Sequence, residues 1–75
     1  MVTLFSHDVN DTLVDGIKNV LKTDGSVKVV NTHETFYGFG FDKDLQNALK
    51  DTGCTIECTE YDKFCGFPCE FVVTR

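Results

Sequence analysis

Several residue classes are absent or scarce in this sequence, and each absence narrows what the chain can encode. Its 75 residues include no tryptophan and one proline. No apolar stretch reaches the roughly 18 residues that a membrane-spanning helix needs, and Met1–Asp8 lacks the basic and apolar regions of a secretory signal, so we expect neither. Proline-, serine- or glycine-rich linkers and internal repeats are also missing, so we expect a single domain over residues 1–75.

Basic residues are scarce as well. Lys and Arg number 7 against 12 for Asp and Glu, which gives a formal net charge of -5. The acidic residues are spread along the chain, and several lie where the amino ends of predicted helices favour negative charge, namely Asp8, Asp11, Asp42 and Asp44. Because contacts to phosphates require Lys and Arg, this charge disfavours nucleic acid as a partner. The same negative charge is consistent with docking onto a basic protein surface.

The spacing of apolar residues predicts the secondary structure. Helical spacing occurs from Asn10 to Lys22, and again after Asp42 as far as Gly53. The inner face of the second helix is predicted to consist of Leu45, Ala48 and Leu49. Strand-like alternation occurs at residues 2–6, 26–31, 35–41, 54–60 and 67–74. This pattern predicts an α+β domain in the ferredoxin-like order β-α-β-β-α-β plus a C-terminal strand, with two helices on one face of a small antiparallel sheet.

The four cysteines lie close together in the sequence, at Cys54, Cys58, Cys65 and Cys69. Two C-x3-C pairs suggest zinc, but an extended first pair would hold its sulfurs about 13 Å apart, too far to share one ion. In a hairpin centred on Tyr61-Asp62, Cys54 would face Cys69 and Cys58 would face Cys65. We favour free, mostly buried thiols without a cofactor in a cytoplasmic protein, where disulfides are uncommon. Zinc held by the four cysteines and two disulfides are the alternatives.

The segment from Tyr37 to Phe41 is the most informative part of the chain. On a strand, Tyr37, Phe39 and Phe41 would share one face. Gly38-Phe39-Gly40-Phe41 resembles the centre of the third-strand signature of the RNA-recognition motif, a family with the same β-α-β-β-α-β order. The resemblance implies an aromatic sheet face that stacks on bases. The alternatives are that these rings belong to the core or contact a protein.

These observations together predict a small acidic interaction module without catalytic residues. A domain of this size offers little concavity, and no spacing brings His7 and Asp8 together with His33. We expect the partner to be another protein, as for the inhibitors or modulators that bacteriophages and mobile elements direct at host enzymes in the host cytoplasm; a homodimer is also open. The candidate binding residues are Tyr37, Phe39, Phe41, Asp42 and Asp44, or else an unpaired edge strand. The alternative functions are a single-stranded nucleic-acid-binding domain and a zinc-stapled structural module.

Overall fold

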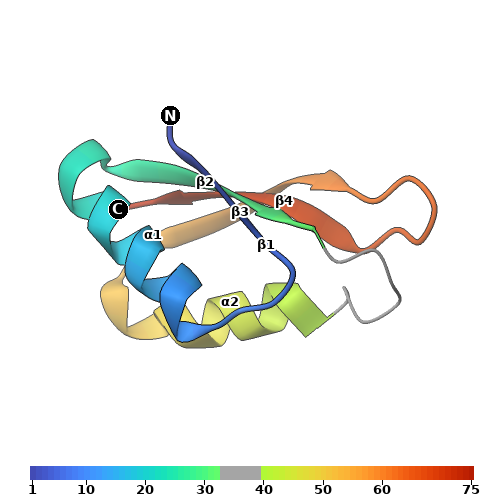
Figure 1. Ribbon diagram of the computed structural model, residues 1–75, viewed down its shortest axis with the longest axis horizontal. Helices are drawn as coiled ribbons and strands as arrows, with labels where there is room; N and C mark the ends of the chain where they lie inside the picture. Colours follow the sequence, from blue (N-terminus) through green and yellow to red (C-terminus); the bar gives the residue numbers. More distant parts are fainter. Residues whose placement is uncertain (33–39) are drawn as a thin grey trace.

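Four strands form one mixed sheet in the computed structural model, which describes residues 1–32 and 40–75 (Figure 1). β1 runs parallel to β2, whereas β4 is antiparallel to both β2 and β3. The spatial order is β1-β2-β4-β3, so β1 and β3 are the two edges of this sheet. The strands span Thr3–Ser6 (β1), Ser26–Asn31 (β2), Thr55–Tyr61 (β3) and Pro68–Thr74 (β4).

The first helix, α1, spans Asp11–Asp24 and carries the chain from β1 to the parallel strand β2. Asn10 caps its amino end, where the side-chain oxygen accepts a hydrogen bond from the backbone N–H of Leu13 at 2.8 Å. Gly25 ends the helix at φ 80°, a left-handed conformation that glycine adopts without steric cost. The predicted helix is therefore confirmed, and it extends two residues beyond Lys22, to Asp24.

The second helix, α2, spans Phe41–Leu49 and continues into a 3-10 turn, η2, at Lys50–Thr52. Phe41 was expected on a strand, and this prediction is wrong. Phe41, Leu45 and Leu49 recur every four residues and all are buried, so the helical period begins at Phe41. Ala48, predicted on the inner face, is exposed. The rest of that expected strand, residues 35–39, lies outside the described residues.

The described elements follow the order β-α-β-α-β-β, and the topology is not the predicted ferredoxin-like one, because β1 pairs directly with β2 instead of with a strand inserted between them. The sheet is mixed rather than antiparallel, because α1 returns the chain to a position directly beside β1 and parallel to it. β4 then takes the interior position between β2 and β3. The α+β class is confirmed, and both helices lie on the same side of the sheet (Figure 1).

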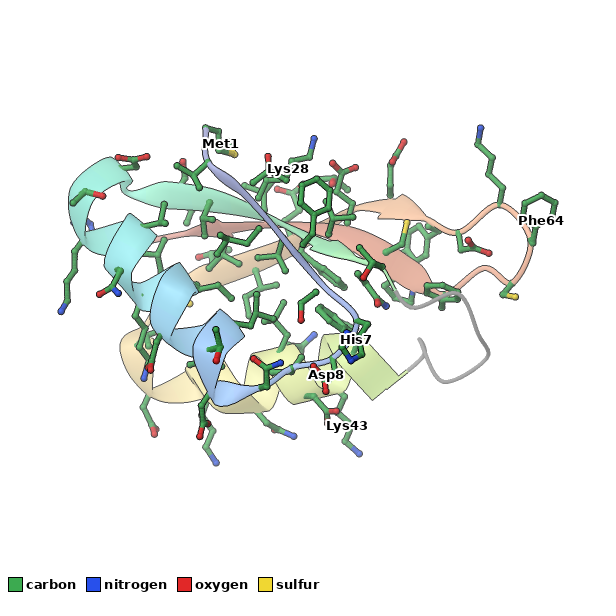
Figure 2. The ribbon with its side chains drawn as sticks, viewed as in Figure 1. Met1, His7, Asp8, Lys28, Lys43 and Phe64 are labelled. Carbon is green, nitrogen blue, oxygen red and sulfur yellow. The ribbon has the colours of Figure 1, made fainter. Side chains whose placement is uncertain are left out.

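The core lies between the two helices and one face of the sheet. Its buried side chains are Leu13, Ile17, Leu21, Val27, Val29, Phe41, Leu45, Leu49, Phe71 and Val73. On the other face of the sheet, Lys28 of β2 forms an ion pair with Glu70 of β4, and Figure 2 shows Lys28 on the side away from both helices. Among the described residues, neither helix has the length and apolar character needed to cross a membrane.

Candidate functional site

The structure places Phe41, one of the three predicted aromatic binding residues, in the core. Its side chain is 4 % exposed and stacks on Phe71 with the ring centroids 5.7 Å apart. The other two, Tyr37 and Phe39, lie outside the described residues. Phe41 also occupies a helix, whereas the third-strand signature of the RNA-recognition motif requires a strand at this position. The exposed aromatic residues of this protein must therefore be sought elsewhere.

The two predicted acidic binding residues, Asp42 and Asp44, lie in the first turn of α2. Asp42 accepts a hydrogen bond from the side-chain amide of Gln46 at 3.0 Å, and Asp44 is exposed. The N-cap residue, Gly40, has no side chain that could cap this helix, and negative charge in the first turn stabilises its amino end. The positions of both carboxylates thus have a structural reason that does not involve a partner.

The four cysteines are free thiols; Cys65 is exposed and the other three are half-buried. The predicted hairpin of β3 and β4 forms, but the predicted register is wrong, because Cys58 lies opposite Phe71 rather than Cys65. Phe71 is fully buried in the core, opposite Cys58. Among residues 1–32 and 40–75, no three or more His, Cys, Asp or Glu side chains gather where they could hold a metal ion.

The register differs because the turn is a long loop rather than a two-residue turn at Tyr61-Asp62. β3 ends at Tyr61 and β4 begins at Pro68, so residues 62–67 connect them. The backbone of Asp62 closes this loop twice: its N–H donates to the Phe67 carbonyl at 2.8 Å, and its carbonyl accepts from Gly66 N–H at 3.0 Å. Gly66 has φ 78°, which permits the reversal.

The side chain of Asp62 braces the same loop from inside. Its Oδ2 accepts hydrogen bonds from the backbone N–H groups of Phe64 at 3.0 Å and Cys65 at 2.7 Å. Aspartate is suited to this position because its short carboxylate reaches backbone donors two and three residues ahead. We call residues 61–67 the hairpin tip. Its backbone is held by four hydrogen bonds in all, which give the loop a defined conformation.

The hairpin tip exposes two aromatic side chains. Phe64 is 95 % exposed and Tyr61 is 62 % exposed, whereas Phe67 is buried and anchors the loop to the domain. Figure 2 shows Phe64 at the end of the molecule, where it points away from the sheet. A pocket of about 360 Å³ lies beside it, lined by Phe64 and Cys65 of the tip and by residues that include Val30 and Thr32. The exposed Phe64 side chain therefore lies next to this pocket.

Carboxylates lie near the tip and affect the pKa of a neighbouring thiol. Burial raises the pKa of the Cys69 thiol, and the carboxylates of Glu60 and Asp62 raise it further. The pKa of Tyr61 is raised chiefly by its hydrogen bond to Cys58. Both groups are consequently uncharged at neutral pH, and neither is activated as a nucleophile.

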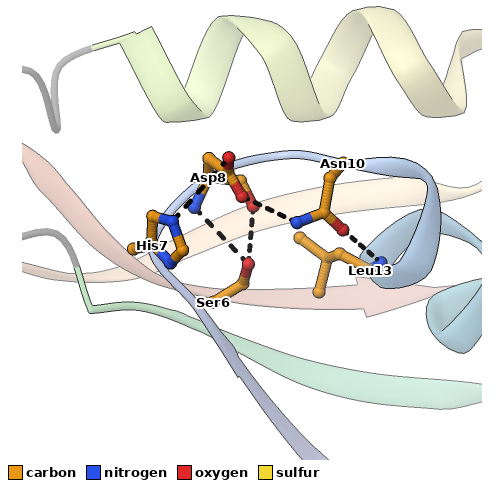
Figure 3. Close-up of polar contacts among 5 residues, drawn as sticks. All are labelled: Ser6, His7, Asp8, Asn10 and Leu13. Carbon is orange, nitrogen blue, oxygen red and sulfur yellow. Dashed lines mark hydrogen bonds and ion pairs between the residues drawn. The ribbon is translucent and has the colours of Figure 1, made fainter.

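His7 and Asp8 belong to the connection between β1 and α1 (Figure 3). Nε2 of His7 is 3.9 Å from Oδ2 of Asp8, and both side chains are exposed. Asp8 accepts a hydrogen bond from the side chain of Asn10 at 2.7 Å, and its carbonyl accepts one from Ser6 Oγ at 2.6 Å. This network orients Asn10 as the cap of α1. His33 lies outside the described residues.

Reasoning from the sequence did not identify the hairpin tip, although a signal was present. Asp62-Lys63-Phe64-Cys65-Gly66 places a side-chain acceptor and a glycine four residues apart between two strands. This pattern is typical of a braced loop between strands, and it could have indicated a connection longer than a two-residue turn.

Comparison with known proteins yields no relationship from which a function could be transferred. No protein-family model, no curated protein and no solved structure matches this chain.

Proposed function

We propose that this chain is a non-enzymatic protein-binding module that docks through its hairpin tip, with Phe64 as the main anchor. The observation that supports this proposal is the combination of exposure and order in one residue. The Phe64 ring is 95 % exposed, yet its backbone N–H is held by Asp62. A large apolar side chain on an ordered loop at the surface gives the domain itself no stability, whereas a partner gains from its burial.

Binding of a partner would remove the Phe64 ring from water and would require an ordered loop to carry that ring. Full burial of a phenylalanine side chain is favourable by about 2 kcal/mol, which corresponds to about a 30-fold change in affinity. Ordering a flexible loop would offset part of that gain. Because hydrogen bonds to Asp62 already order this loop, the offset is small. Anchors of this kind are typical of the centre of a protein–protein interface.

The chemistry of the tip also indicates the partner. Asp62 and Lys63 lie in the tip, Glu60 directly precedes it, and the whole chain carries a net charge of -5. We propose that the partner presents an apolar pocket bordered by Lys or Arg side chains. A cytoplasmic inhibitor or modulator of a host enzyme, of the kind that bacteriophages and mobile elements encode, would have this design.

The proposal is tested with tagged wild-type protein and two matched variants in nuclease-treated lysate. Phe64→Ala removes the proposed anchor, and Phe5→Ala removes a 68 % exposed phenylalanine on β1, at the opposite edge of the sheet. We expect a specific protein to be retained by the wild type and by Phe5→Ala. With that protein purified, Phe64→Ala should bind at least about tenfold more weakly.

Three results would count against the proposed function. Equal binding of the identified protein by Phe64→Ala and wild type would show that the tip is not the anchor. Retention of nucleic acid alone would favour the aromatic nucleic-acid alternative. Retention of no protein from any host lysate would remove the support for a protein partner.

A further inference from the structure

We infer that the free edge of β3 accepts an extended segment of the partner as a fifth strand, and that this segment alternates basic and apolar side chains. The inference rests on the proposed function and names the form in which the partner binds. Among the described residues, β3 pairs on one side only, with β4. A strand with an unpaired side offers N–H and C=O groups to another chain.

The direction of the backbone groups follows from the register of the sheet. The Arg75 N–H donates to the Gly25 carbonyl at 2.9 Å, which places their backbone groups between β2 and β4. Along an antiparallel strand the direction of these groups alternates. The backbone N–H and C=O groups of Phe71 and Val73 in β4 therefore point toward β2, whereas those of Val72 and Thr74 point toward β3.

The same alternation determines which groups of β3 are free. Thr55 lies opposite Thr74 and Glu57 lies opposite Val72, so these two residues of β3 bond to β4. The N–H and C=O groups of Ile56 and Cys58 consequently point away from β4, toward the edge. Two successive sites for a ladder with an added strand are thus available before the bulge that follows Cys58.

The two sheet edges are not equivalent as acceptors. β1 has four residues, whereas β3 has seven, and neither strand contains proline or lysine. Lysine and proline are residues that commonly protect edges against pairing. The charged residues of β3 are Glu57 and Glu60, both exposed. Their carboxylates favour Lys or Arg at the neighbouring positions of an added strand and repel acidic ones.

The face of β3 that packs on the core determines where the added strand needs apolar side chains. Ile56 and Cys58 pack against the core but are only half-buried, because no strand lies beyond them among the described residues. An apolar side chain on an added strand would extend the core over both. The added strand must therefore place basic residues on the Glu57 face and apolar residues on the Ile56 face.

A second copy of this chain fits the edge less well than a basic segment. Pairing β3 with its own copy would bring the carboxylates of two Glu57 and two Glu60 residues to one interface, between chains of net charge -5. Continuity with the hairpin tip also favours a separate partner. β3 ends at Tyr61, the first residue of the tip, so one ligand can pair with β3 and bury Phe64.

The inference is tested with a capped synthetic peptide of eight residues that alternates lysine and valine. Hydrogen exchange followed by NMR should show slower exchange of the Ile56 and Cys58 N–H groups when this peptide is added. The peptide is compared with two N-methylated forms. One is methylated on the backbone nitrogens of its lysines, and the other on the backbone nitrogens of its valines. Because only one set can face β3, one form should bind at least about tenfold more weakly and the other should bind almost as well.

Matched controls test the charge and the edge. A peptide with glutamate in place of lysine should not bind, and Glu57→Gln should weaken binding of the lysine peptide more than Asp15→Asn, which neutralises an exposed carboxylate on α1. Equal binding of both methylated forms, protection of β1 instead of β3, or no binding at low salt would overturn the inference.

Failure of this inference can be separated from failure of the proposed function. The peptide has no site for Phe64, so Phe64→Ala should leave peptide binding unchanged. If the identified partner requires Phe64 but the peptide does not protect β3, only the fifth strand is wrong. If the peptide protects β3 but partner binding does not require Phe64, the proposed anchor is wrong.

Discussion

Phe64 and Phe67 lie three residues apart in the same loop, and their environments are opposite. Phe67 is 2 % exposed and Phe64 is 95 % exposed, although the two side chains are chemically identical. The loop between Tyr61 and Pro68 is braced by Asp62, which directs one ring into the domain and the other into solvent. The comparison shows that one short loop can separate a stabilising role from a binding role, and it can be tested by changing each residue in turn.

The largest effect is expected from Phe67→Ala. Truncation of a buried phenylalanine removes apolar contacts and leaves a cavity, so the free energy of unfolding should fall by about 3 kcal/mol. Phe64→Ala should change it by less than about 0.5 kcal/mol, because the ring is exposed. Urea denaturation followed by circular dichroism measures both values. Equal destabilisation by the two variants would contradict the separation of roles.

A smaller effect is expected from Asp62→Ala, which removes the acceptor for two backbone N–H groups. The free energy of unfolding should fall by about 1–2 kcal/mol, and partner binding should weaken although Phe64 is still present. Asp62→Asn retains a side-chain oxygen, so its free energy of unfolding should fall less than that of Asp62→Ala. Asp51→Ala, which removes an exposed carboxylate from η2, is the control and should leave stability and binding unchanged. Full partner binding by Asp62→Ala would show that the brace is unnecessary.

A still smaller effect is expected from Gly66→Ala. The Cβ would meet no atom within 4 Å, so the cost comes from φ 78° alone and should be about 1 kcal/mol. Gly40→Ala is the matched control, because that glycine also has open space around it but has φ -79°. Thermal unfolding should show a lower Tm for Gly66→Ala only. A similar Tm for both variants would argue against a strained turn.

The last expected difference concerns thiol reactivity and involves no change in stability. Cys65 is exposed, whereas the raised pKa of Cys69 keeps its thiol protonated to a higher pH than usual. Iodoacetamide near pH 8 should therefore label Cys65 before Cys69, and the rate at Cys69 should continue to rise above pH 9. Peptide mass spectrometry measures both rates. Faster labelling of Cys69 would contradict the half-buried, acidic environment.

The sequence was sufficient to predict elements whose apolar pattern has a clear period and clear ends. Leu13, Ile17 and Leu21 define α1, with Asn10 and Gly25 as its caps, and the alternating valines define β2. The β3–β4 hairpin was also predicted. In each case local side-chain chemistry and tertiary burial favour the same conformation.

The sequence was not sufficient where two periods overlap or where pairing partners are distant. Phe41 ends an alternating aromatic run and also begins a helical repeat with Leu45, and burial against Phe71 decides between the two. Strand order is a second case, because alternation within a strand does not say which strand lies beside it. The hairpin register is a third case, since it depends on six residues of loop whose bracing aspartate was read as part of a two-residue turn.

The interior position of β4 has a consequence for the order in which this domain forms during synthesis. β4 follows β1, β2 and β3 in the sequence, yet it is the strand that joins β2 to β3. Of the strand pairs formed by residues 1–32 and 40–75, a nascent chain that has not yet released residues 68–74 from the ribosome can form the four-residue pair of β1 with β2, but not the pairs that involve β4. Most of the sheet must therefore assemble late, in a single cooperative step, and a ribosome stalled before Pro68 should display a protease-sensitive chain.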